Sequence, residues 1–199
     1  MKKVLLIAVA AIFGMTTTNA QSDKGDFTLA PQIGVNISSY ASDADFNTRT
    51  SIAGGVVAEY YFSDRWSFRS GLIYDAMGAE DSFGNIDKLN YITLPLNANW
   101  HFGSKRNWYL NFGPAVSFLA SANAELTDGQ EFDLKDFVPS TDIGLTIGIG
   151  YKFNIDENTQ MYIDYQGYGG FTNLDDTDAL PYDIRNSRSS FNVGVIFNL

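Results

Sequence analysis

The sequence predicts an all-β protein, an eight-stranded antiparallel up-and-down transmembrane β-barrel, and three observations lead to this fold class. Eight segments alternate between apolar residues and small or polar residues, as strands with two different faces do. Most of them have 11 to 14 residues, whereas soluble strands have about 5–6 and tilted strands that cross a bilayer need about 9–11. Short and long connections alternate between them, which is typical of bacterial outer-membrane barrels.

The predicted signal peptide occupies residues 1–20. Lys2 and Lys3 precede the apolar run Val4–Met15, and small residues before residue 21 form a cleavage site. The apolar run is shorter than the ~20 residues that a spanning helix needs, which argues against a membrane anchor. We therefore predict export through a cleaved signal peptide and one barrel domain, residues 21–199, in the cell outer membrane.

Charge and composition exclude several classes of protein. Because two of the 13 basic residues lie in the predicted signal peptide, the mature chain has 11 basic and 23 acidic residues, a formal charge of −12. Nucleic-acid binding is disfavoured, since phosphate contact needs a basic face. The chain has no Cys, so it forms no disulfide and carries no lipidated Cys anchor.

The predicted strands alternate with connections of two lengths. The strands are Phe27–Ser38, Ser51–Phe62, Trp66–Gly78, Leu89–Phe102, Trp108–Ser121, Thr141–Phe153, Thr159–Phe171 and Arg188–Leu199. The short connections are Ser63–Arg65, Gly103–Asn107 and Asn154–Asn158. The long ones are Ser39–Thr50, Ala79–Lys88, Ala122–Ser140 and Thr172–Ser187. This sorting predicts short periplasmic turns, long extracellular loops and both mature termini in the periplasm.

The two faces of the strands indicate which side meets lipid. In Thr141–Phe153, one face is apolar or aromatic from Ile143 onward, and the other consists mostly of Gly and Thr with two charged residues. A soluble lipocalin-like barrel, the competing fold, would turn its apolar face inward around a ligand. The signal peptide, the strand length and the sorted loops place the apolar face outward, against lipid.

Aromatic residues gather at the predicted short-turn end. Amphipathic rings prefer the headgroup region, so these residues are expected to form an interfacial girdle, with cross-strand packing as an additional role. They are Phe62, Trp66, Trp100, Phe102, Trp108, Tyr151 and Phe153.

Six charged residues fall on the predicted lumen face, and we interpret them as a salt-bridge network. Buried charges must be paired, and the interior of an eight-stranded barrel is just wide enough for side chains to fill, so a packed plug is favoured over a narrow ion path. The six are Glu59, Arg69, Asp75, Lys152, Asp164 and Arg188. If Phe62 lies opposite Trp66 in the short hairpin, Glu59 lies opposite Arg69, and the two are predicted to form an ion pair.

The last strand has the pattern of a barrel-assembly signal. Apolar residues recur two apart up to the final residue, at Phe191, Val193, Val195, Phe197 and Leu199. Outer-membrane barrels commonly end in this way, although Leu199 stands where a final Phe is more usual. The pattern predicts the barrel-assembly machinery as one partner and outer-membrane lipids as another.

Short motifs resemble the PorT-like outer-membrane β-barrel family of Gram-negative bacteria. Tyr91–Trp100 resembles its Tyr…Pro-Leu strand, and Asn111–Pro114 resembles the Gly-Pro strand that follows. Asp142–Tyr151 resembles its Asp-x-Gly…Gly-x-Gly-Tyr strand, and Gly170–Leu174 resembles a Gly-Leu-Thr-Asn segment. The resemblance covers the mature chain and implies an eight-stranded barrel of the OmpA/OmpX-like type. Some members act in protein secretion or gliding.

No catalytic, cofactor-binding or metal site is predicted. His101, the single His, lies at the short-turn end without an obvious Ser or Asp for a triad. The long loops carry fourteen acidic and four basic residues, so an extracellular ligand or a divalent cation is a candidate partner there. Asp175–Asp178 lacks the spacing of a calcium-binding loop. We favour a non-enzymatic structural or interaction role; the alternatives are a narrow pore or small-solute transporter, a secretion-system component, a lipid-modifying enzyme using His101, and a soluble lipocalin-like binder.

Overall fold

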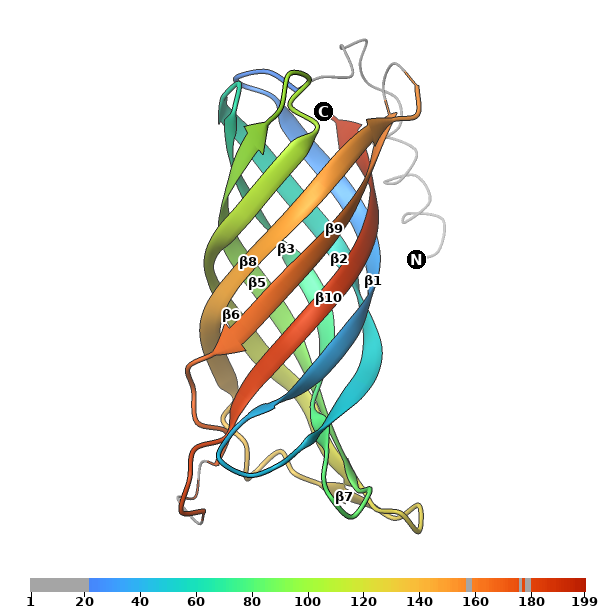
Figure 1. Cartoon of the computed structure of the whole chain (residues 1–199), viewed down its shortest axis with the longest axis vertical. Coiled ribbons are helices and arrows are strands. Elements are labelled where there is room, and N and C mark those ends of the chain that lie inside the picture. The colour runs from blue at the N-terminus through green and yellow to red at the C-terminus, as the bar shows by residue number, and fades with distance from the viewer. Residues whose placement is uncertain (1–21, 157–158, 176, 178–179) are drawn as a thin grey trace, which may run out of the picture.

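The computed structural model describes residues 22–156, 159–175, 177 and 180–199, and these residues form a closed antiparallel β-barrel (Figure 1). The predicted signal peptide, residues 1–20, lies outside the described residues. Within the part of the chain that the structure describes, no helix has the length and apolar character needed to cross a membrane.

Eight long strands build the barrel wall and two short strands extend it, counted over the described residues. They are β1 (Phe27–Ala41), β2 (Asn47–Ser63), β3 (Trp66–Met77), β4 (Ala79–Glu80), β5 (Ile86–Phe102), β6 (Trp108–Glu125), β7 (Glu131–Asp133), β8 (Thr141–Asn154), β9 (Thr159–Gly170) and β10 (Arg185–Asn198). The long strands pair in chain order, and β10 returns to β1, where Val35 lies between Ile52 of β2 and Phe191 of β10. The predicted eight-stranded fold is confirmed.

The ends of the strands depart from prediction on one side only. We call the end with the β2–β3, β5–β6 and β8–β9 connections the short-turn end, which is uppermost in Figure 1, and the opposite end the long-loop end. At the short-turn end the predicted boundaries agree within one residue. At the long-loop end β2 begins at Asn47 and β5 at Ile86, so strands replace much of the predicted loop Ser39–Thr50 and, with β4, half of Ala79–Lys88. β6 continues to Glu125, into the predicted loop Ala122–Ser140. The strands continue there although their residues no longer alternate between apolar and polar, because backbone hydrogen bonds between strands do not depend on lipid-facing side chains.

A glycine separates β3 from its continuation β4. Gly78 has a φ of +131°, in the region that side chains rarely adopt, and a Cβ at this position would lie 2.0 Å from the carbonyl oxygen of Asp87. The close approach of β5 therefore requires Gly at this position.

Large apolar side chains cover the outer surface of the barrel. Ile33 and Ile147 are 73% and 67% exposed, whereas their inward neighbours Gln32 and Thr146 are buried. An apolar surface of this extent is too large for a soluble monomer and suits a lipid-facing wall. The lipocalin-like orientation, with the apolar face inward, is wrong for this chain.

The predicted interfacial aromatics lie side by side on the outer surface near the short-turn end. Ring centroids are 6.4 Å apart for Trp66–Trp100, 5.1 Å for Trp100–Phe102 and 6.3 Å for Phe102–Trp108. The chain of contacts continues through Tyr151 to Phe153, with centroids at 4.9 Å from Trp108 to Tyr151 and 5.5 Å from Tyr151 to Phe153. Phe62 is half-exposed on the same surface. These rings therefore pack against one another across neighbouring strands, in addition to the headgroup girdle predicted from the sequence.

The hairpin between β2 and β3 corrects one predicted pairing. Trp66 lies opposite Ser63, not Phe62, because a bulge lies between Tyr61 and Ser63. Ser63 Oγ accepts hydrogen bonds from the backbone N–H of Arg65 at 3.4 Å and of Trp66 at 3.0 Å, which closes the turn. A bulge adds one residue to one strand, so it shifts only the positions between itself and the turn.

Beyond the bulge the predicted register holds. Tyr60 lies opposite Phe68, and Glu59 lies opposite Arg69. The first pair faces outward and is exposed, and the second pair faces the lumen and is buried.

Barrel closure generates the first testable prediction. Phe197 of β10 pairs with Leu29 of β1 and Thr159 of β9, so deleting residues 197–199 leaves part of β1 with a partner strand only on its β2 side. Unpaired backbone groups are costly in lipid, so the truncated chain should not assemble. Heat-modifiable gel migration of the outer-membrane fraction measures this. Deletion of Thr127–Gly129 from a loop is the matched control, and a folded, membrane-inserted truncation would contradict the prediction.

Candidate functional site

The candidate site is the lumen, where all six predicted charged residues are at most 8% exposed. Alternation of the side chains along each strand directs these residues inward. They form three polar layers between the short-turn end and the long-loop end. The six are Glu59, Arg69, Asp75, Lys152, Asp164 and Arg188.

The first layer, nearest the short-turn end, is built around Glu59. Its carboxylate accepts hydrogen bonds from Asn99 Nδ2 at 3.0 Å and from Ser67 Oγ, and it forms an ion pair with Lys152 Nζ at 3.3 Å. His101 Nε2 lies 2.8 Å from Glu59 Oε1, at hydrogen-bonding distance. A desolvated carboxylate is costly unless its oxygens are bonded, and this arrangement supplies four partners.

The contacts of His101 do not make a catalytic triad. Ser67 Oγ lies 2.9 Å and Glu59 Oε1 lies 2.8 Å from the same ring nitrogen, Nε2. In a triad the acid and the nucleophile contact different nitrogens of the ring, so that the acid orients the base toward the nucleophile. Ser67 is also fully buried. Ser67 and His101 belong to the paired strands β3 and β5, and residue types alone do not reveal that these two side chains meet.

The second layer, in the middle of the barrel, is built around Arg69 and Asp164. Their ion pair measures 3.4 Å, and Tyr109 OH bonds both, accepting from Arg69 at 3.1 Å and donating to Asp164 at 2.8 Å. Asn192 Nδ2 donates to the other carboxylate oxygen at 2.8 Å. The guanidinium carbon also lies 4.8 Å from the ring centroid of Tyr162, a cation–π distance.

The predicted ion pair between Glu59 and Arg69 is therefore wrong. The two residues are directly opposed in the ladder, but Arg69 reaches Asp164 across the lumen and Glu59 reaches Lys152. Register decides which Cβ atoms are neighbours, whereas long side chains in a narrow barrel can contact partners on the far wall.

Two inward glycines make room for the tyrosine rings of this layer. A Cβ at Gly150 would lie 2.2 Å from the ring of Tyr109, and a Cβ at Gly194 would lie 2.3 Å from the ring of Tyr162. The sequence predicted a Gly-rich lumen face, and at these two positions Gly is required because a larger side chain would overlap a tyrosine ring.

The third layer joins Asp75 and Arg188, whose side chains form an ion pair of 3.3 Å. Asp75 also accepts hydrogen bonds from Asn36 Nδ2 at 2.7 Å and Thr93 Oγ1 at 3.3 Å. Each of the six predicted charges therefore has a partner of opposite sign within the lumen.

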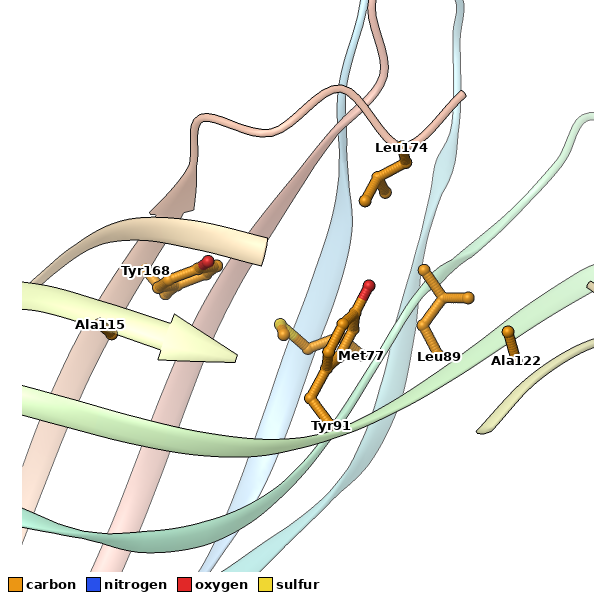
Figure 2. Close-up of a cluster of buried hydrophobic side chains, with 7 residues drawn as sticks. All are labelled: Met77, Leu89, Tyr91, Ala115, Ala122, Tyr168 and Leu174. Atoms are coloured by element: carbon orange, nitrogen blue, oxygen red, sulfur yellow. The ribbon is translucent and has the colours of Figure 1, made fainter. Parts of the chain in front are cut away.

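An apolar cluster, which we call the apolar cap, extends from the level of the third layer toward the long-loop end. Leu174, on the connection between β9 and β10, lies over Met77, Leu89 and Tyr91 (Figure 2) and is held by a hydrogen bond from its backbone N–H to Ile184 O at 2.7 Å. The buried members of this apolar cap are Met77, Leu89, Tyr91, Ala115, Ala122, Tyr168 and Leu174.

Several acidic loop residues accept hydrogen bonds within their own turns. Asp175 accepts hydrogen bonds from the backbone and hydroxyl of Thr177 at 3.1 and 2.6 Å, and Asp176 and Asp178 lie outside the described residues. Slight desolvation raises the pKa of Asp81, but hydrogen bonds from the Asn85 side chain and the loop backbone outweigh it and hold this pKa below its ordinary value. Over the described ranges, no group of three or more His, Cys, Asp or Glu side chains is placed to hold a metal ion.

Fold and lumen together define a small outer-membrane β-barrel with a side-chain-filled interior. The chain belongs to the outer membrane protein beta-barrel domain family, whose match covers residues 19–176. Membership in this family implies an outer-membrane location. No curated protein matches the chain in sequence.

Solved structures with the same fold are distant in sequence. The outer membrane protein OprG from Pseudomonas aeruginosa matches with a TM-score of 0.59 and 10% identity, over 92% of this chain and 99% of its own. Outer Membrane Protein W of E. coli matches with a TM-score of 0.55 and 13% identity, over 89% and 99%. Neisserial surface protein A matches with a TM-score of 0.52 and 16% identity, over 85% and 96%. At these identities the likeness supports the fold alone.

The second layer generates a stability prediction. Arg69→Met leaves Asp164 buried without its cation, which should lower the free energy of unfolding by about 3–5 kcal/mol. Arg65→Ala, in the exposed turn, should change it by about 0.5 kcal/mol or less. Adding Asp164→Asn to Arg69→Met should recover part of the loss, because the uncompensated charge is removed. Denaturant unfolding in detergent micelles measures all three, and equal recovery by Glu59→Gln would contradict the assigned pairing.

Proposed function

We propose that this chain is a sealed, non-enzymatic outer-membrane barrel that acts through its extracellular surface, where acidic loops meet a partner. The observation that carries the proposal is the filled lumen. Three bonded polar layers and the apolar cap occupy the interior, so the surface that remains for a macromolecular partner is the outside of the barrel. A narrow pore, or a secretion-system component that passes a substrate, would need an open interior, whereas the proposed role does not.

The bonded layers argue against a conducting path. An ion crossing the lumen would have to displace the Glu59–Lys152, Arg69–Asp164 and Asp75–Arg188 pairs and then pass the apolar cap. Breaking a buried pair leaves an uncompensated charge and costs about 3–5 kcal/mol for each pair. The role of a lipid-modifying enzyme finds no support either, because the contacts of His101 do not suit a base.

The long-loop end has the features of an interaction surface. Its connections carry most of the acidic residues, and Phe83 is 83%, Phe132 50% and Phe137 57% exposed there. Large apolar side chains exposed on loops beyond the barrel wall are candidates for contact with a protein. We infer that the partner presents a basic surface, since opposite charges steer association.

Export and assembly belong to the same proposal. We infer that residues 1–20 are cleaved during export and that the β10 residues Phe191, Val193, Val195, Phe197 and Leu199 are read by the barrel-assembly machinery. The PorT-like motifs support assignment to that subgroup, since Tyr91–Trp100 lies within β5 and Asp142–Tyr151 within β8.

A conductance measurement tests the sealed lumen. In planar bilayers at about 1 M salt, the wild-type barrel should give no discrete current steps, because its buried pairs and apolar cap block ion passage. A variant lacking Leu174 together with the Asp75–Arg188 pair is the comparison in which leakage should rise. Reproducible steps from the wild-type barrel would favour the pore instead.

Charge neutralisation tests the interaction surface. Changing four acidic residues of the β6–β8 connection to amides should weaken binding of a fluorescent octalysine peptide several-fold, and salt should weaken it further. The barrel is held in nanodiscs of zwitterionic lipid, so that the lipid does not compete. The matched control neutralises four acidic residues of the short-turn end, and equal weakening by both variants would remove the support for an extracellular acidic site. The loop set is Asp128, Glu131, Asp133 and Asp136, and the control set is Asp23, Asp26, Asp64 and Asp156.

A further inference from the structure

A polar cavity of about 320 Å³ opens at the short-turn end, which faces the periplasm in the topology of this family. Its floor is formed by Tyr61, His101 and Lys152, which belong to β2, β5 and β8, and all three are buried. Lys105 and Arg106, in the β5–β6 turn, lie on its rim. The first polar layer thus ends in an open cavity on the side opposite to the acidic loops.

Basic residues outnumber acidic ones in the lining of this cavity, the opposite of their ratio in the whole chain. Three cations, Lys105, Arg106 and Lys152, line it with one carboxylate, Asp64, although the chain has 13 basic and 23 acidic residues. Asp23 forms an ion pair with Arg106 and Glu59 forms one with Lys152, so carboxylates hold these two cations in place.

Lys152 supplies a buried, oriented donor at the floor. Its side chain is 5% exposed, and its ammonium bonds Glu59 Oε2 at 3.3 Å and the hydroxyl of Tyr61. An ammonium carries three N–H donors, which is more than these two partners use. The position is therefore suited to a further acceptor in the cavity.

Arg106 keeps a strained backbone at the rim. Its φ of +53° makes it the one non-glycine residue with positive φ among those that the structure describes. The side chain disfavours this left-handed conformation, and such strain is concentrated at functional positions. Its guanidinium donates to Asp64 O at 2.7 Å and to Asp23 Oδ1 at 2.8 Å, which places it at the mouth.

The first described residues cover part of the opening. Ser22 is buried and lines the cavity, and Gly25 N–H donates to Tyr61 O at 2.7 Å. The ion pair of Asp23 with Arg106 connects this segment to the rim, so removing the Asp23 charge should release the guanidinium from the segment.

We propose that this cavity binds a small oxyanion, the phosphate or carboxylate group of a periplasmic solute, with Lys152 at the floor and Lys105 and Arg106 at the rim. Charge-assisted N–H donors converging on one cavity are the usual means of holding phosphate and carboxylate. The volume lies at the lower end of small-molecule sites, which span about 300–1,000 Å³, so the ligand is a single small molecule. The site is separate from the extracellular acidic loops and does not depend on their role.

Calorimetric titration of the full barrel in zwitterionic detergent tests the proposal, with inorganic phosphate, citrate and dihexanoyl phosphatidic acid as probes. Saturable binding of phosphate or citrate assigns a free solute of that group, and preference for the phosphatidic acid assigns a lipid headgroup phosphate. Arg106→Gly relieves the left-handed strain and removes the cation, so it should weaken binding about tenfold. If none of the three probes binds saturably to the wild type, the proposal is wrong.

Three further variants separate charge from shape. Asp23→Asn removes the ion pair of Arg106 but keeps its guanidinium, so the affinity for the anion should stay equal or rise. A loss of affinity as large as that of Arg106→Gly would show that the covering segment matters rather than the cation, and would overturn the proposal. Lys105→Gln should weaken binding and serves if Arg106→Gly fails the heat-modifiability check for folding. Arg185→Gly, at the long-loop end, should leave affinity unchanged.

Discussion

Closure of the β-ladder is the constraint on which the rest of this structure depends. A membrane core offers no water to the backbone, so every N–H and C=O within it must be bonded inside the protein. Here β10 pairs with β1 from Thr28–Asn198 to Ala41–Arg185, with an interruption at Ala30 and Pro31, and the wall is closed. Because closure involves all eight long strands, it also determines how many side chains enter the lumen.

The filled lumen follows from this closure. Alternation sends every second residue inward, and a barrel of eight strands leaves just enough space for those side chains. Charged residues among them are removed from water, so they persist only with partners, and each of the three layers supplies both signs. Small residues such as Gly150 and Gly194 then become necessary, because they leave space for the rings of Tyr109 and Tyr162.

The two ends of the barrel differ in chemistry. The long-loop end combines acidic loops, exposed aromatic side chains and the apolar cap. The short-turn end has tight turns, a girdle of contacting aromatic rings and an open cavity lined by Lys105, Arg106 and Lys152. This difference underlies the two proposals, contact with a macromolecule at the long-loop end and capture of a small solute at the short-turn end.

The sequence alone determined the strand number, the lipid face and the inward position of the charges, because all three follow from residue period and segment length. It also determined the register beyond the bulge, where Glu59 lies opposite Arg69. The tertiary structure decided which side chains meet across the lumen, because the alternation of residues along a strand does not specify this. Partners such as Asp164 for Arg69, or Ser67 beside His101, come from strands that meet only when the barrel closes. The same holds for the cavity at the short-turn end, whose lining combines two turns, four strands and the first described residues.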